Sequence, residues 1–159
     1  METAAQSGQC CVMVLHRPLR NPAAFDFYLD RVKLKRVEHA RDLGVIIDQH
    51  LSFKCQAETA VRKMKQMVGM TMKLLTFHLT SRVVPRNVCC RILLDIIKPS
   101  VLFGAEFWLN FHPYVASELD FLSAQLLNLA FRLPNPLPAH GILREAAVVP
   151  VLIDAARGC

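Results

Sequence analysis

Residues 54–77 carry the pattern that most constrains the fold, because two kinds of side chain recur there at helical spacing. Small or apolar residues return every three or four positions and form one stripe: Ala57, Ala60, Val61, Met64, Val68, Thr71 and Leu75. Basic residues line up on another face, at Arg62, Lys65 and Lys73, with Lys63 flanking them. The segment is therefore predicted to form a long helix with one apolar face and one basic face.

Prolines divide the following residues into further predicted helices. A turn at residues 80–81 precedes Pro85, which suits the first turn of a helix that runs to about Lys98. One side of this helix carries Val88, Ile92, Asp95 and Ile96. Pro99 is expected to break or kink it, because proline lacks the backbone N–H that a helix interior needs.

A third helix is expected to begin at Pro113. Its core stripe is formed by Val115, Leu119, Leu122, Leu126 and Leu129. The prolines at positions 134, 136 and 138 should end this helix. Shorter helices are expected at residues 140–147 and after Pro150.

The first 50 residues predict short strands instead of helices. Residues 11–15 form an apolar run that suits a buried strand, and residues 25–29 are also β-like. Residues 32–37 begin with alternation of apolar and basic side chains, and Asp30 with Arg31 is placed as the two-residue turn before them. Residues 43–47 predict a further strand. The expected fold is thus α+β, with a small antiparallel sheet at about residues 11–47 followed by a helical domain.

Composition supports a folded chain with an uneven charge. Of the 159 residues, 53% are apolar and 20% are charged, a composition too apolar for a disordered chain. A chain of this length can also bury a sizeable core. The net charge of +6 is concentrated in residues 51–100, which carry nine basic and two acidic residues. This imbalance favours an anionic partner for the middle third of the chain.

No catalytic or metal-binding pattern is found in the cysteines and histidines. The six cysteines include two adjacent pairs, at positions 10–11 and 89–90, without Cys-x-x-Cys spacing, and the six histidines show no triad or ligand spacing. The most apolar window, residues 88–108, contains four charged residues, so no membrane span and no membrane partner are expected. The N-terminus lacks the features of a secretory signal, which predicts an intracellular protein, in the nucleus or cytoplasm.

Three segments of the chain carry distinctive motifs: residues 41–54 (RDLGVIIDQHLSFK), residues 97–108 (IKPSVLFGAEFW) and residues 142–150 (ILREAAVVP). In this order they resemble the region just after the catalytic core of reverse transcriptases from non-LTR (LINE-type) retrotransposons. Residues 41–54 are similar to the family pattern YLGV-x-ID-x-x-LSF/W-K-x-H. Residues 97–108 (IKPSVLFGAEFW) look like P-x-L-x-YG-x-E-x-W, and residues 142–150 (ILREAAVVP) look like LRE-x-x-x-x-P. Gln56 replaces the family's histidine and Phe103 replaces its tyrosine.

The resemblance implies a primer grip and a thumb that contact an RNA–DNA hybrid or duplex. It divides the chain into a tail with one short strand (1–24), a primer-grip-like β element (25–53) and a thumb-like helical domain (54–159). The nucleic-acid-binding residues it implies are Gly44, Lys54, Arg62, Lys63, Lys65 and Lys73. Two alternatives stay open. Gly44 could serve only to relieve crowding in a small antiparallel sheet, and the basic helix face could contact only solvent. Trp108 and Phe103 are expected in the core.

The family's catalytic aspartates lie upstream of the Leu-Gly-Val segment and hold two metal ions. This chain contains no Asp-Asp pair, so the resemblance implies that it lacks the palm and fingers and is inactive alone, with no catalytic residue and no metal site. Mg²⁺ would belong to the missing palm, and no cofactor is expected in this chain. A non-enzymatic protein-interaction module and a non-functional translated remnant are the alternatives.

Overall fold

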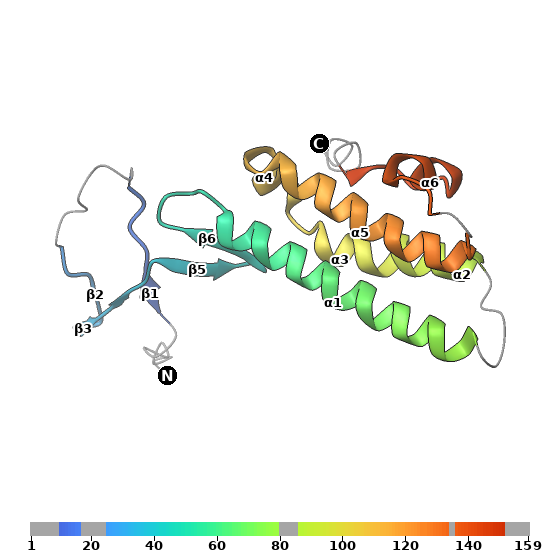
Figure 1. Ribbon diagram of the computed structural model, residues 1–159. Helices are drawn as coiled ribbons and strands as arrows, with labels where there is room; N and C mark the ends of the chain where they lie inside the picture. The colour runs from blue at the N-terminus through green and yellow to red at the C-terminus, as the bar shows by residue number, and fades with distance from the viewer. Residues whose placement is uncertain (1–9, 17–24, 80–85, 134–135, 152–159) are drawn as a thin grey trace. The chain divides into compact units, whose positions relative to one another are not determined.

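The computed structural model describes residues 10–16, 25–79, 86–133 and 136–151 (Figure 1). The chain forms two compact units, Met1–Cys55 and Gln56–Cys159. Strands occur in the first unit and helices in the second, with the longest helix beginning at the last two residues of the first unit. The predicted α+β class is therefore confirmed.

The described part of the first unit contains three pairs of short strands. The parallel pair joins β1 (Cys11–Val12) to β4 (Lys35–Arg36). The antiparallel pairs join β2 (Tyr28–Leu29) to β3 (Val32–Lys33), and β5 (His39–Asp42) to β6 (Val45–Asp48). The strands expected at residues 11–15, 25–29 and 32–37 are thus shorter than predicted, and one pair is parallel.

Both hairpins turn through two residues with positive φ, the combination that type I′ turns require. In the first hairpin these residues are Asp30 (φ 49°) and Arg31 (φ 65°), so the turn predicted there is confirmed. In the second they are Leu43 (φ 46°) and Gly44 (φ 95°). The strand predicted at residues 43–47 is therefore wrong at its start, because its first two residues make the turn.

The helix α1 (Lys54–Leu79) confirms the long helix predicted from the apolar stripe. Four members of the stripe are at most 3% exposed, namely Ala57, Ala60, Met64 and Val68. Thr71 and Leu75 are also buried, and Val61 is half-buried. The basic residues of the predicted opposite face are exposed, so periodicity alone identified both faces.

Residues 86–101 form a continuous helical segment made of three pieces. These are α2 (Arg86–Arg91), the π-helix η1 (Ile92–Ile97) and α3 (Lys98–Val101). Buried side chains follow each other four residues apart, at Cys89, Leu93 and Ile97. A break or a kink was expected at Pro99, but the helical segment continues through this residue to Val101. The backbone has already widened to i→i−5 bonding, with the Lys98 N–H donating to the Leu93 carbonyl, and a wider turn leaves more room for the proline ring.

The later helices within the described residues include α4 (Ala105–Trp108), the 3₁₀ turn η2 (Leu109–Phe111), α5 (Pro113–Phe131) and α6 (Ala139–Glu145). The start of α5 at Pro113 is confirmed. The helix ends at Phe131, shortly before the three prolines expected to end it, and Arg132 leaves it in the left-handed region at φ 50°. The predictions at residues 80–81, at Pro85, at Pro134 and beyond Val151 fall outside the described residues.

Within the second unit, α1, α5 and the α2–α3 segment lie side by side, and α6 packs on α5 (Figure 1). The largest fully buried side chain is Trp108, as predicted for the core, and its indole N–H donates to the Phe103 carbonyl at 3.4 Å. The Phe103 side chain is 57% exposed, so its predicted core position is wrong. It lies in the turn before α4, next to Gly104 at φ 67°.

Two side chains hold the segment that follows α6. The Lys98 side chain is 3% exposed, and its ammonium group donates to the carbonyl of Val149. The carboxylate of Asp120 on α5 accepts a hydrogen bond from the backbone N–H of Val151 at 3.0 Å. Val148, next to the first attachment, and Val151, at the second, are both buried, so this segment belongs to the core of the second unit.

Candidate nucleic-acid interface

Three of the predicted binding residues share one exposed face of α1. Arg62 and Lys73 are eleven positions apart, which is close to three helical turns, so they face the same direction. Lys65 lies almost one turn after Arg62. Each of the three side chains is exposed, and a phosphate backbone can reach them from solvent.

Lys65 is the member of this face with a charged partner. Its ammonium group pairs with the carboxylate of Glu118 on α5 at 2.7 Å, with side chains 56% and 37% exposed. The pair ties α1 to α5 and partly neutralises the positive charge at Lys65. Among the residues that the structure describes, Arg62 donates to the Thr59 hydroxyl one turn earlier, at 3.4 Å.

Lys63 belongs to another flank of α1. Its ammonium group donates to the Ser100 carbonyl on α3 at 2.7 Å. Lys63 is 100° away from Arg62 on the helix, so the two side chains point apart. The hydrogen bond gives Lys63 a structural role between α1 and α3.

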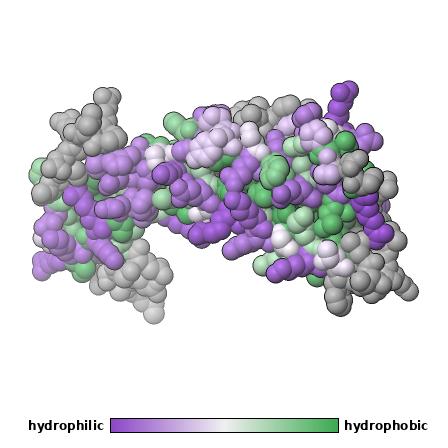
Figure 2. All heavy atoms as spheres, viewed as in Figure 1, coloured by the Kyte–Doolittle hydropathy of each residue, from purple (hydrophilic) through white to green (hydrophobic). Residues whose placement is uncertain are grey.

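A groove of about 350 Å³ runs beside the basic face, between α1 and α5. Its apolar lining residues are Ala57, Val61 and Val115, and its polar ones are Glu58, Arg62, Lys65, Gln66, Tyr114 and Glu118. Two carboxylates offset the two cations there, so the groove itself is not strongly attractive to anions. Figure 2 shows hydrophilic and hydrophobic residues next to each other over the helices of this unit.

Gly44 and Lys54 lie in the first unit. Gly44 occupies the second position of the β5–β6 turn, where its positive φ is a conformation that favours glycine, and its carbonyl accepts from the Arg41 side chain at 3.4 Å. The turn therefore gives a conformational reason for the glycine. Lys54 is exposed at the first position of α1, where its N–H donates to the Ser52 hydroxyl.

Asp48 is a structurally important residue that the sequence analysis did not single out. Its carboxylate is 5% exposed and accepts hydrogen bonds from the backbone N–H groups of His50 (3.3 Å), Ser52 (3.1 Å) and Phe53 (2.7 Å). Burial by itself raises the pKa of Asp48, but the hydrogen bonds from Ser52, Phe53 and His50 outweigh it and lower the pKa below the ordinary value. An aspartate directly before a polar turn is the signal that identifies such a residue.

Two cysteines and a pair of histidines are further titratable side chains with contacts of their own. Burial raises the pKa of Cys89 and of Cys90, which favours the unreactive thiols. The His16 and His50 rings meet edge to face at 4.7 Å, and His50 Nδ1 lies 3.1 Å from the His16 carbonyl. Among the described residues, no three His, Cys, Asp or Glu side chains gather as metal ligands would.

Comparison with known proteins gives no match among family models, curated proteins or solved structures. Within the described ranges, no helix combines the length and the apolar character needed to cross a membrane.

Proposed function

We propose that this chain is a primer-grip and thumb-like element that binds an RNA–DNA hybrid or duplex through its phosphates and does not itself polymerise. The observation that supports this most directly is the exposed alignment of Arg62 and Lys73 on a 26-residue helix. The two residues are about 16 Å apart along the helix axis, at 1.5 Å per residue. A helix with this face can follow a nucleic-acid backbone over several phosphates.

Such contacts are electrostatic and independent of sequence. Lysine and arginine release condensed counterions when they meet phosphates, so affinity falls steeply as salt rises. Lys65 contributes less than the other two residues in this proposal, because Glu118 already compensates part of its charge. Lys63 serves mainly to join α1 to α3.

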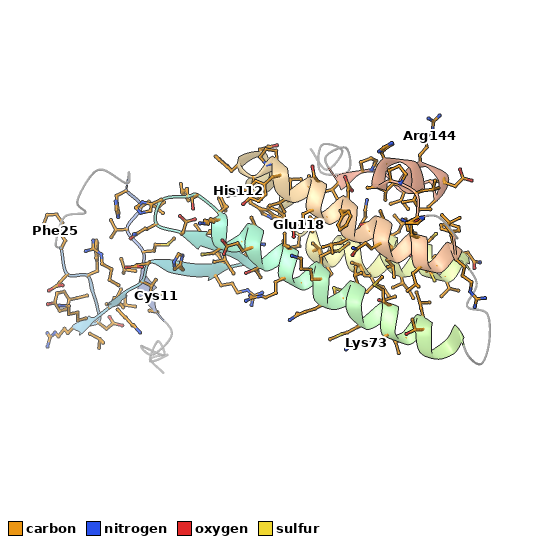
Figure 3. All side chains as sticks on the ribbon, in the orientation of Figure 1. Cys11, Phe25, Lys73, His112, Glu118 and Arg144 are labelled. Atoms are coloured by element: carbon orange, nitrogen blue, oxygen red, sulfur yellow. The ribbon has the colours of Figure 1, made fainter. Side chains whose placement is uncertain are left out.

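The experiment compares two double variants that each remove two positive charges. The double variant Arg62→Ala/Lys73→Ala should flatten the log–log salt dependence of duplex binding by about two units. The control Arg91→Ala/Arg144→Ala changes exposed residues at the end of α2 and on α6 and should leave the slope nearly unchanged. In Figure 3, Arg144 and Lys73 lie on opposite sides of the helical unit. Equal slopes for both variants would refute the proposal.

The same preparations should show no extension of a primed RNA template with Mg²⁺ or Mn²⁺. The reason is chemical, since two-metal polymerases hold their ions with paired carboxylates and this sequence contains no Asp-Asp pair. Template-dependent extension that persists through purification would contradict this part of the proposal.

A second candidate function is protein interaction, and exposed aromatic side chains favour it. Five of them lie from the turn before α4 to the middle of α5, each at least 55% exposed: Phe103, Phe107, Phe111, Tyr114 and Phe121. Exposed apolar surface of this kind promotes association. Sedimentation at tens of micromolar (order of magnitude) should then show self-association, whereas a compact monomer would count against it.

A further inference from the structure

One flank of α5 carries two exposed aromatic rings next to α1. Tyr114 lines the groove between the two helices and is 59% exposed, and Phe121 is 55% exposed. The two residues are seven positions apart, which is almost two helical turns. They therefore lie on the same flank as Glu118, which pairs with Lys65 of α1 (Figure 3). Because exposed aromatic side chains are typical anchors of protein interfaces, this flank offers apolar surface to a partner.

The exposed face of α1 carries opposite charges toward its two ends. Glu58 lines the groove near the start of the helix, and Lys73 follows fifteen positions later, about 22 Å along the axis. The two positions differ by about 60° around the helix, so one face holds both. In the part of the chain that the structure describes, neither side chain belongs to an ion pair. Both charges are therefore open to a partner.

The pair of charges on α1 and the pair of rings on α5 share one centre. Residues 65–66 lie halfway between the two charges, and residues 117–118 lie halfway between the two rings. Lys65 and Glu118 are joined at this centre by their ion pair of 2.7 Å. The helices α1 and α5 run in the same direction (Figure 1). A two-fold axis along the ion pair therefore reverses both helices about the same point.

We propose that two copies of this chain form a dimer through this face, about a two-fold axis that follows the central ion pair. The axis crosses both helices, so each helix packs antiparallel against the same helix of the other copy. Tyr114 of each copy then meets Phe121 of the other, and Glu58 of each copy meets Lys73 of the other. The charges are thus complementary in a dimer of identical chains. The dimer rests on the second candidate function, protein interaction, and gives it a partner and a geometry.

The surface is also open where the dimer needs space. The same axis sets Arg62 of each copy opposite Gly69 of the other, because these two positions also lie equally far from the centre. In the described structure, a Cβ atom added to Gly69 would have no contact within 4 Å beyond the adjacent residues and the helix backbone. The gap can therefore receive the Arg62 side chain. Lys65 falls opposite Gln66, so its charge does not face a second cation.

The dimer covers the basic face that the proposed function gives to duplex binding. Arg62 and Lys73 lie within the contact, so a chain in the dimer does not present them to phosphates. Self-association and duplex binding therefore exclude each other. A short duplex added in excess should convert the dimer into complexes of one chain with duplex, as measured by sedimentation velocity. A dimer that stays intact on the duplex would overturn the proposed contact.

The main test reverses charges on α1 in the full chain and measures the dimer dissociation constant by sedimentation equilibrium. Glu58→Lys sets two cations against each other at both symmetry-related contacts and should weaken the dimer about tenfold. Glu58→Lys/Lys73→Glu restores opposite charges and should return the constant to within about threefold of the natural value. The control Glu145→Lys makes the same change of charge on the exposed surface of α6 and should have little effect. Failure of the double reversal to restore the dimer would overturn the proposal, as would equal effects of Glu58→Lys and Glu145→Lys.

Size and shape provide an independent readout. Phe121→Ala should weaken the dimer about tenfold, whereas Phe107→Ala, which removes a ring that is 64% exposed on α4, should not. Gly69→Leu should keep or raise the thermal stability of the chain, because leucine favours helices more than glycine does. It should still weaken the dimer, because it fills the gap opposite Arg62. If either Phe121→Ala or Gly69→Leu dimerises like the natural chain, the proposed contact is wrong.

The outcomes distinguish this dimer from the two proposed functions. Glu58→Lys should bind duplex at least as tightly as the natural chain, because it adds a cation and releases the basic face. Weaker duplex binding by this variant would contradict the shared face. Self-association that survives both Glu58→Lys and Phe121→Ala would keep the protein-interaction function and overturn this dimer. A natural chain that stays monomeric at tens of micromolar (order of magnitude) would overturn both and leave duplex binding standing.

Discussion

The Asp48 carboxylate is expected to be the strongest single polar contributor to the stability of the first unit. Replacing it by alanine removes three acceptor contacts, to the N–H groups of His50, Ser52 and Phe53. Two residues of the loop it holds, Leu51 and Phe53, have φ of 53° and 55°, a conformation that bulky side chains adopt at a cost. The carboxylate therefore offsets backbone strain as well as satisfying donors.

The magnitude follows from the geometry. A hydrogen bond to a charged group contributes about 1.5–3 kcal/mol, and the contacts of one carboxylate are not additive. The 2.7 Å bond to Phe53 is strong, whereas the 3.3 Å bond to His50 is long. Because His50 and Ser52 are exposed, water reaches this loop and partly replaces the lost acceptor. The expected loss for Asp48→Ala is about 2–4 kcal/mol in the free energy of unfolding.

Urea unfolding followed by far-UV circular dichroism gives the free energy, and amide hydrogen exchange at Phe53 locates the change. The matched control is Asp42→Ala, which removes an exposed carboxylate from β5 of the same hairpin and should cost at most about 0.5 kcal/mol. If Asp48→Ala loses no more stability than Asp42→Ala, or if Phe53 exchange is unchanged, the carboxylate does not hold the loop.

The lowered pKa of Asp48 also fixes the sign of a pH effect. Stability from this group is fully present above the ordinary aspartate pKa and is lost as pH falls through the lower pKa of the folded chain. Asp48→Asn should abolish that part of the acid destabilisation. The natural chain and the Asn variant should therefore converge in stability at low pH.

Further substitutions test other parts of the fold. Leu43→Asn should stabilise the β5–β6 hairpin by about 0.5–1 kcal/mol in thermal unfolding, because asparagine tolerates positive φ, whereas Gly44→Val should cost more than about 1 kcal/mol there. Leu126→Ala should cost about 2–5 kcal/mol, measured by urea unfolding, because Leu126 is fully buried. Glu118→Gln should cost less than about 1 kcal/mol, since its pair with Lys65 is exposed, and should strengthen duplex binding in a salt titration.

Periodic patterns predicted the helices well, and local backbone chemistry explains the misses. The apolar stripe that includes Met64 lies within α1, and Pro113 lies at the start of α5. Each signal is contained in a single helix, so the sequence suffices to place that helix. The turn at Leu43 was missed because leucine is not a turn residue, and the turn forms only where β5 pairs with β6. The continuation of the helix through Pro99 was not predicted, because no local pattern in the sequence marks the π-helix before it.

In the candidate interface, too, some features follow from the local sequence and others depend on tertiary contacts. Exposure of Arg62 and Lys73 follows from helical phase. The ion pair between Lys65 and Glu118 joins residues 53 positions apart, and it depends on how α1 meets α5. The parallel pairing of β1 with β4 likewise joins strands that the β2–β3 hairpin separates in the sequence. Such contacts are tertiary, and no local signal in the sequence specifies them.

The attachment of the segment after α6 has a consequence for synthesis of the chain. Lys98 is made about 50 residues before its acceptor at Val149, and Asp120 about 30 residues before the N–H group of Val151. At 5–20 residues per second, several seconds pass before both partners exist. During that interval the emerging helices cannot close their core around Val148 and Val151. The helical unit should therefore complete its folding late, once nearly all of its residues have left the ribosome.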